Sequence, residues 1–182
     1  MPKPVTIMGR SSSITNSFVN GIIPCIKPTD MEIETALNIL GMEKNEVLCA
    51  YCGDIATEWD HLRPLIVDKK PTGYISEIHN LVTACGKCNQ SKGNLNWREW
   101  INGDAKLSPK SRKIQNIEEK VELLEKYEKW GNPVKIDFEE IVGKELWGKH
   151  WNNYALLIKE MEKCQETSSM IKELIDIKIN TI

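Results

Sequence analysis

The 182-residue sequence lacks any run of about 18 apolar residues, the length that a membrane-spanning helix needs. Its first ten residues, Met1–Arg10, also lack the apolar stretch of a secretory signal. No internal repeat, low-complexity tract or long Pro/Gly-rich linker interrupts the chain. We therefore expect a cytoplasmic protein without a membrane span, built either as one domain or as one small core with appendages.

The sequence also lacks an overall excess of positive charge. Its 24 Lys and Arg residues stand against 26 Asp and Glu residues, for a net charge of −2, so the total gives no sign of a polyanion-binding protein. The distribution is less even, because residues 84–113 hold seven basic and two acidic residues and residues 118–140 hold eight acidic and four basic ones. The first segment could neutralise phosphates, although an ordinary mixed surface explains the pattern too.

Cysteines are few but are placed in a pattern. Four of the six form two Cys-x-x-Cys pairs, Cys49/Cys52 and Cys85/Cys88. Two such turns supply the four tetrahedral thiolates of a closed structural zinc site, and the 32 residues between the pairs imply a folded insertion. A thioredoxin-like redox pair or plain buried thiols are the alternatives. Cys25 and Cys164 have no partner motif and are expected to be small buried hydrophobes.

Apolar periodicity and turn residues predict an α+β fold, in which a small β-containing core around the cysteines is surrounded by helices from both ends. We expect an N-terminal arm and helix over residues 1–44, the core over 45–104, and a helical region over 105–182. Before the first cysteine pair we expect an irregular segment over 1–24 and a helix capped by Thr29 or Asp30 and ended by Gly41. Short strands are expected within 47–82, with a loop at 67–73, and a helical turn at 96–101. After the core we expect a helix from Ser108-Pro109 to Gly131, a helix from near Gly148, and either helix or edge strand over 170–182.

The insertion carries residues that point to chemistry. Asp60-His61-Leu-Arg63-Pro64 lies between the cysteine pairs, Asn80-Leu precedes the second pair, and Asn89-x-x-Lys92 follows it. In this order the motifs resemble the HNH (His-Asn-His) endonuclease superfamily, in its zinc-stapled form, over about residues 47–102. The sequence departs from the family at the last position, where Asn89 stands instead of His. That variant also occurs among phage resolvases and restriction enzymes of the superfamily.

The resemblance implies a ββα-metal unit, in which two strands carry Asp60-His61 and the Asn80 region and a helix begins near Asn89. His61 would be the base that deprotonates water. Asp60 and Asn89 would hold one Mg²⁺ or Mn²⁺ ion through oxygen atoms, and Asn80 would brace the loop that bears the base.

Arg63, Lys92 and Arg98 are candidate DNA contacts. The alternative is a surface ion pair for Arg63 and a solvated side chain for Lys92. His150, Trp97 and Trp100 are interpreted as structural, and His79 as incidental, because it precedes the matched Asn80.

These features favour a metal-dependent endonuclease that acts on double-stranded DNA, most simply a type II restriction enzyme. Another nuclease role, such as junction resolution or phage DNA processing, is one alternative, and a non-catalytic zinc-stabilised DNA-binding module is the other. Cutting both strands favours a homodimer. Its interface would come from two apolar stripes, which otherwise would cover the core of one chain: Ile114, Ile117, Val121 and Leu124, and the residues Ile171, Leu174, Ile175, Ile177 and Ile179.

Overall fold

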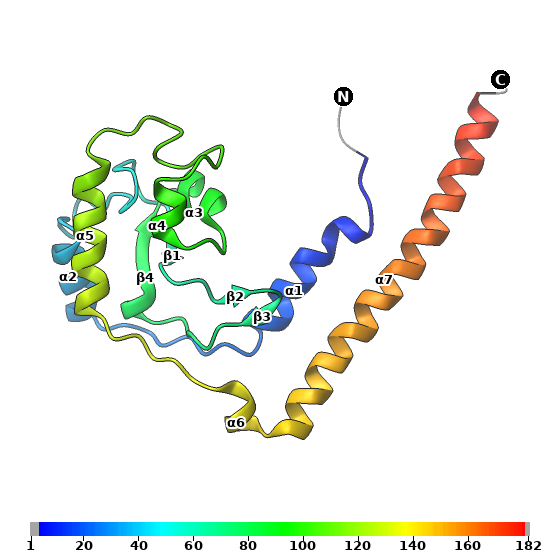
Figure 1. Cartoon of the computed structure of the whole chain (residues 1–182), viewed down its shortest axis with the longest axis horizontal. Coiled ribbons are helices and arrows are strands. Elements are labelled where there is room, and N and C mark those ends of the chain that lie inside the picture. The colour runs from blue at the N-terminus through cyan, green and yellow to red at the C-terminus, as the bar shows by residue number, and fades with distance from the viewer. Residues whose placement is uncertain (1–3, 181–182) are drawn as a thin grey trace. The chain divides into compact units, whose positions relative to one another are not determined.

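A computed structural model describes residues 4–180 (Figure 1). By their contacts the residues fall into two compact units, one of residues 22–136 and one made from the two ends of the chain, up to residue 21 and from residue 137. This grouping differs from the expected division at residues 44 and 104. The helix before the first cysteine pair and the segment up to residue 136 belong with the cysteine-containing core.

The fold is mixed α and β, as expected, and its centre is a ββα unit. Strand β1 (Glu58–His61) pairs antiparallel with β4 (Leu81–Ala84). Helix α3 (Gly86–Lys92) follows β4 after a single residue, Cys85, which is its N-cap. The helix therefore begins before Asn89 and places this residue in its middle, not at its start.

Helix α2 (Asp30–Ile39) forms where the sequence predicts it. The Thr29 hydroxyl accepts from the Glu32 amide and the Glu32 carboxylate accepts from the Thr29 amide, which is a complete capping box. Its residues Ala36 and Leu37 are buried in the core. The helix thus covers one side of the cysteine-containing unit.

The segment expected as a loop contains a small hairpin. Strands β2 (Ile66–Val67) and β3 (Lys70–Pro71) pair antiparallel. The two residues between them, Asp68 and Lys69, both have positive φ, at 50° and 63°. Positive φ at both central residues is typical of the type I′ turn, whose twist matches that of the paired strands. The chain then continues through the 3-10 turn η2 (Ile78–Asn80) into β4.

Helix α4 (Trp97–Ile101) is the predicted helical turn, capped by the Asn96 side chain. Both of its tryptophans are 2% exposed and belong to the hydrophobic core, which confirms their structural interpretation.

Helix α5 (Ile117–Trp130) begins later than the Ser108-Pro109 pair predicts. Ser108 does accept from the Ser111 amide, but it caps only a turn, and Asn116 then adopts a left-handed φ of 58°. On α5, Leu124 is fully buried, and Ile117 and Val121 pack against the core together with Ile114, which precedes the helix. The first apolar stripe therefore packs against the core of its own chain, which was the alternative to a dimer interface.

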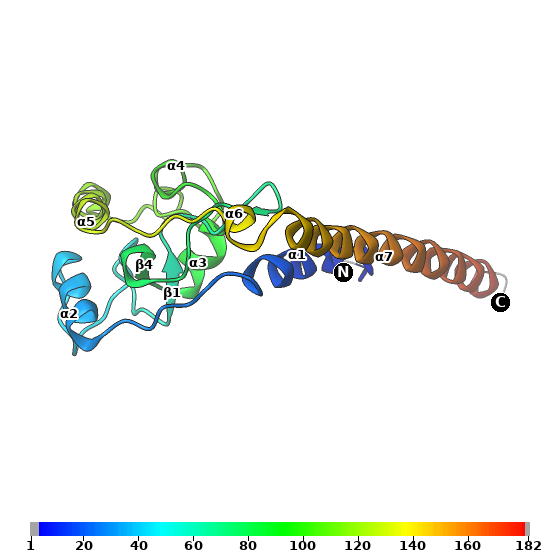
Figure 2. The same ribbon diagram turned by 90° about the horizontal axis from the view of Figure 1, so that it is seen from below.

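The second unit is helical. It contains η1 (Met8–Arg10), α1 (Ser11–Asn20), α6 (Phe138–Val142) and α7 (Lys144–Ile179). The expectation of an irregular N-terminal segment is therefore wrong for residues 8–20. Helix α1 lies along α7 (Figure 2), where Thr15 hydrogen-bonds the Tyr154 hydroxyl at 2.8 Å and Val19 is fully buried.

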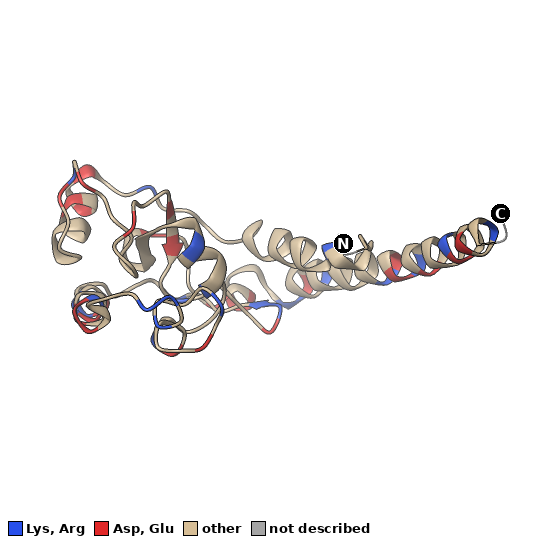
Figure 3. Ribbon diagram, turned by 90° about the horizontal axis from the view of Figure 1, so that it is seen from above, with Lys and Arg blue, Asp and Glu red and all other residues tan. Residues whose placement is uncertain are grey.

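Helix α7 starts before Gly148 and extends through the C-terminal segment that the sequence left open. Residues 181 and 182 lie outside the described part of the chain. Basic and acidic residues alternate along α7 (Figure 3), and no helix among residues 4–180 has the length and apolar character to cross a membrane.

Candidate active site and metal centre

The four predicted cysteines come together in one buried cluster. The first pair lies on a tight knuckle in which the Gly53 amide donates to the Cys49 carbonyl at 2.8 Å, and Gly53 has a φ of +78° that suits glycine. The second pair lies at the start of α3. Sγ atoms of Cys49, Cys52, Cys85 and Cys88 all lie within 4.8 Å of one another.

The cluster has the chemistry and spacing of a structural zinc site. A zinc–sulfur distance of about 2.3 Å in a tetrahedron separates the sulfurs by about 3.8 Å, and the Cys52 and Cys85 sulfurs are 3.7 Å apart. Hydrogen bonds within the cluster lower the pKa of the Cys52 thiol and raise the pKa of the Cys49 and Cys88 thiols. The protein alone therefore favours one thiolate, and a bound zinc ion would deprotonate the others. The arrangement is that of a closed site with no room for a catalytic ligand.

Arg112 touches this cluster and was not predicted. Its guanidinium donates from Nη2 to the Cys88 sulfur at 2.9 Å and lies 3.5 Å from the Asp54 carboxylate. The side chain is 14% exposed. A guanidinium here offsets the negative charge of metal-bound thiolates. No motif marks Arg112, because it follows the second cysteine pair by 24 residues.

The two remaining cysteines differ from the expectation. Cys25 and Cys164 are both exposed, not buried. Cys25 lies in an extended segment that forms a β-bridge with Ser76, and Cys164 lies on the outer surface of α7. Both are free thiols.

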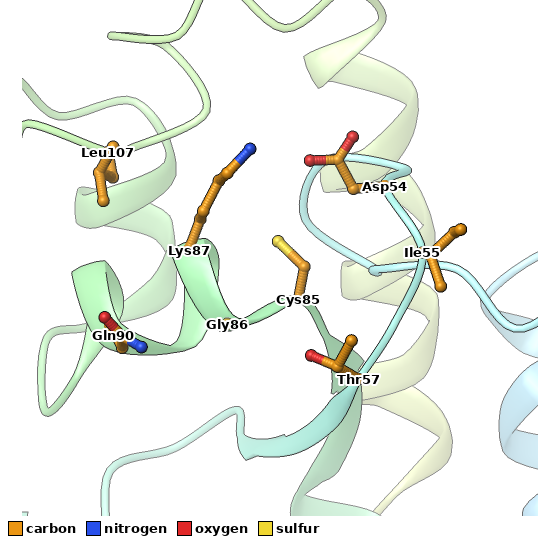
Figure 4. A pocket seen from close by; sticks show the side chains of 8 residues that line it. All are labelled: Asp54, Ile55, Thr57, Cys85, Gly86, Lys87, Gln90 and Leu107. Carbon is orange, nitrogen blue, oxygen red and sulfur yellow. The ribbon is translucent and has the colours of Figure 1, made fainter.

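An open pocket lies next to the metal centre. It is lined by Asp54, Ile55 and Thr57 on one side and by Gly86, Lys87 and Gln90 of α3 on the other (Figure 4). The Cys85 side chain points into the space between them. His61, Asp60 and Asn89 do not line this pocket, so it belongs to the metal centre and not to the reacting groups.

His61 ends β1, and its ring is partly buried. Its Nε2 atom is 3.0 Å from the Ser76 hydroxyl. Burial, with the nearby charge of Lys92, lowers the pKa of His61 to about 4. The imidazole is therefore neutral near pH 7 and has a lone pair that can accept a proton.

Asp60 points into the core, because neighbouring side chains in a strand alternate between faces. It is 5% exposed. Its Oδ2 atom accepts from the Tyr51 hydroxyl at 2.6 Å and lies 3.0 Å from the Lys92 ammonium. Burial raises the pKa of Asp60, and the Lys92 charge opposes this rise.

Lys92 is not at the surface, in contrast to the expectation that it contacts a phosphate. Its side chain is 0% exposed. Besides Asp60, its ammonium donates to the His61 carbonyl at 2.7 Å. Burial lowers the pKa of Lys92, while Asp60 supports the charged form. Lys92 therefore ties the strand that carries Asp60 and His61 to the end of α3.

Asn80 is fully buried and bonds to the loop after His61. Its side-chain oxygen accepts from the Arg63 amide at 2.8 Å, and its nitrogen donates to the Arg63 carbonyl at 3.1 Å. These paired bonds fix the backbone two residues beyond the histidine. A bracing role for Asn80 is consistent with this geometry.

The candidate DNA contacts Arg63 and Arg98 both pair with Glu128, at 3.4 Å and 2.5 Å. Arg98 also lies over the Trp97 ring, 4.4 Å from its centroid. Of the seven basic residues in 84–113, four are engaged with acidic groups. These are Lys92, Arg98, Lys110 and Arg112. The local charge count therefore overstates the positive surface.

Asn89 bonds to a residue that the sequence analysis missed. Its amide nitrogen donates to the Glu58 carboxylate, whereas Asp60 bonds Tyr51 and Lys92. Glu58 precedes Asp60 by two residues, and this spacing places both carboxylates on one face of β1. The same spacing could have identified Glu58 from the sequence. The oxygens of Asp60, Asn89 and Glu58 are donors of the kind that Mg²⁺ and Mn²⁺ prefer.

The two other histidines have structural environments. His79 lies 3.6 Å from Glu77, and its ring packs on Trp130 with centroids 4.6 Å apart. The His150 Nε2 is 3.1 Å from the Phe18 carbonyl oxygen, between α7 and α1. The His150 contact agrees with its structural interpretation, and His79, which was expected to be incidental, has a packing role.

Comparison with known proteins points to the same segment. Residues 49–95 match the family model described as HNH endonuclease. A stretch of 63 residues is 38% identical to a protein named CRISPR-associated endonuclease Cas9 from Corynebacterium diphtheriae, and it covers 32% of this chain but 5% of that protein. No solved structure matches the chain. With the buried four-cysteine cluster and the ββα unit, residues 49–95 constitute an HNH endonuclease domain of the zinc-stapled type.

Proposed function

We propose that this protein is a metal-dependent endonuclease that cuts double-stranded DNA. The observation that carries the proposal is the position of His61. It is a neutral imidazole at the end of β1, next to Asp60 in the sequence, within an HNH domain. A pure DNA-binding module has no need of such a base.

In the proposed reaction His61 takes a proton from the water that attacks the phosphorus. Asp60 and Asn89, with Glu58 beside them, would hold one Mg²⁺ or Mn²⁺ ion. When bound, that ion offsets negative charge on the phosphate and the departing 3′ oxygen. Lys92 keeps Asp60 in place, and Asn80 fixes the loop after the base. The Cys49, Cys52, Cys85 and Cys88 cluster would hold a structural Zn²⁺.

We further propose a type II restriction role in the cytoplasm. The support is that the chain has one compact nuclease unit with added helices, which could read bases or bring two copies together. The Corynebacterium protein is named a CRISPR-associated endonuclease, and the matched stretch covers 5% of that protein, so the name supports a nuclease and not a particular role. Junction resolution or phage DNA processing is the alternative within nucleases.

The test uses purified protein and supercoiled plasmid with Mg²⁺ or Mn²⁺, and with EDTA as a control. We expect cleavage with either metal and none with EDTA. The His61→Ala variant should lose about 10²- to 10⁴-fold in rate while keeping DNA binding. The matched control is His79→Ala, because the His79 ring packs on Trp130.

Two outcomes would contradict the proposal. One is cleavage by His61→Ala at the wild-type rate, and the other is a wild-type protein that binds DNA without cutting it. Sequencing of the cut ends distinguishes the nuclease roles. A single repeated site supports restriction, whereas cutting only at branched DNA supports junction resolution.

A further inference from the structure

Ser76 is held in place by a part of the chain that lies outside the matched HNH segment. The Ile26 amide donates to the Ser76 carbonyl at 2.8 Å, and the Ser76 amide donates to the Pro24 carbonyl at 3.1 Å. Its neighbours Ile75 and Glu77 are 3% and 6% exposed. Ser76 therefore has both backbone groups bonded and both neighbours buried, so its backbone has a fixed position.

That hydroxyl lies 3.0 Å from Nε2 of His61. A serine hydroxyl can donate or accept a hydrogen bond, and a neutral imidazole has a proton on only one of its two nitrogens. The partner of one ring nitrogen decides which nitrogen carries the proton. The Ser76 bond uses Nε2, so Nδ1 is the nitrogen left to take a proton from water.

We propose that Ser76 is a positioning residue for the base. Its Oγ accepts a hydrogen bond from Nε2–H of His61. This bond keeps the lone pair on Nδ1 and fixes the plane of the ring. This inference depends on the proposed role of His61. When Nδ1 takes a proton from water, the ring becomes an imidazolium, and its Nε2–H remains bonded to the Ser76 oxygen, which stabilises the charge that has formed.

The opposite arrangement would be unproductive. If Ser76 donated its proton to Nε2, the single ring proton would lie on Nδ1 and no lone pair would face a water there. Through Ser76, the base is thus connected to residues 24–26, which precede the first cysteine pair.

The experiment compares Ser76→Ala, Ser76→Thr and wild type. The control is Ser91→Ala, which removes a hydroxyl bonded to Trp100 in the same unit at 2.9 Å. Nitrogen-15 NMR of labelled histidine reports the tautomer of His61, identified by its loss in His61→Ala. We expect an Nε2–H tautomer in wild type, Ser76→Thr and Ser91→Ala, and a mixture in Ser76→Ala. We also expect a fall in kcat of about 10- to 100-fold for Ser76→Ala, with little change in KM.

The tautomer and the cleavage rate separate the two claims. An Nδ1–H tautomer in wild type, or a Ser76→Ala variant with the wild-type tautomer, overturns the positioning role, whatever happens to kcat. If the wild-type protein does not cleave DNA but its tautomer depends on Ser76, the nuclease proposal fails while the assigned hydrogen bond stands. Thermal unfolding of each variant identifies loss of folding. If Ser76→Ala does not fold, the tautomer of the wild-type protein decides: Nε2–H supports the positioning role and Nδ1–H overturns it.

Discussion

At the scale of single residues, Lys92 is the position where sequence and structure differ most. Lysine is rarely buried unless it is paired, so the motif Asn89-x-x-Lys92 favoured a phosphate contact. The structure instead surrounds the ammonium with the Asp60 carboxylate and the carbonyls of His61 and Gly93. Lys92 meets Asp60 and the His61 carbonyl only when β1 and α3 pack together. A local sequence pattern therefore does not predict these contacts.

We predict that Lys92→Met destabilises the protein by about 3–5 kcal/mol, because it leaves the Asp60 carboxylate buried without its partner. Chemical denaturation measures this change. Lys87→Met is the matched control, since Lys87 is an exposed lysine on the same helix. The double variant Asp60→Asn with Lys92→Met should recover part of the loss. Equal midpoints for the two lysine variants would contradict the prediction.

The four-cysteine cluster, by contrast, could be predicted from the sequence alone. Two Cys-x-x-Cys turns present thiolates at a spacing set by local geometry, so only their meeting depends on the fold. The placement of Arg112 beside Cys88 depends on the path of residues 102–116, and this explains why it went unnoticed.

We predict that Arg112→Leu speeds the loss of bound zinc to a chromogenic chelator, with a weakening of metal affinity of about 10-fold or more. The reason is that the variant removes the 2.9 Å bond to the Cys88 sulfur. Lys110→Leu is the control, because its partner Asp104 lies at the surface. Identical release curves, or a purified protein without zinc, would count against this role.

At the scale of elements, the helix α2 was predictable and the start of α5 was not. Thr29 and Glu32 form a capping box whose signal is entirely local. Ser108-Pro109 gives an equally good local signal, but the chain makes a turn there and resumes as a helix only after Asn116. Helix α1 is the converse case, since its three consecutive serines favour no helix and packing against α7 supplies the stability.

We predict that Leu124→Ala destabilises the 22–136 unit by about 2–5 kcal/mol. Leu124 is fully buried at the centre of the core-facing stripe of α5. Lys126→Ala on the exposed face of the same helix should change stability by about 0.5 kcal/mol or less. Thermal or denaturant unfolding compares them. A small effect of Leu124→Ala would mean that α5 is an appendage, as the division at residue 104 implied.

At the scale of the whole molecule, the stretch of α7 from Met170 to Ile175 exposes a group of apolar side chains. Met170, Ile171, Leu174 and Ile175 are each more than half exposed. Apolar patches of this kind mark interaction sites, and cutting both strands of a palindrome suits two copies related by a two-fold axis. We therefore propose that this end of α7 joins two copies of the chain.

We predict a dimer in light scattering of the wild-type protein and a monomer for Leu174→Glu. Leu95→Glu is the matched control, because Leu95 is a similarly exposed leucine in the other unit. Plasmid linearisation should slow relative to nicking in the Leu174→Glu variant alone. A wild-type monomer on a short duplex that still makes double-strand breaks would indicate sequential nicking.

The contacts of Ser76 and Arg112 have a consequence for modularity. The HNH family model matches residues 49–95. Ser76, however, forms backbone hydrogen bonds with residues 24–26, and the Cys88 sulfur accepts a hydrogen bond from Arg112. Both of these supports lie within the compact unit of residues 22–136. A transplant of residues 49–95 into another protein would therefore carry every signature residue and neither support. A transplant that keeps both supports needs residues 22–136, a segment about two and a half times as long as the matched one.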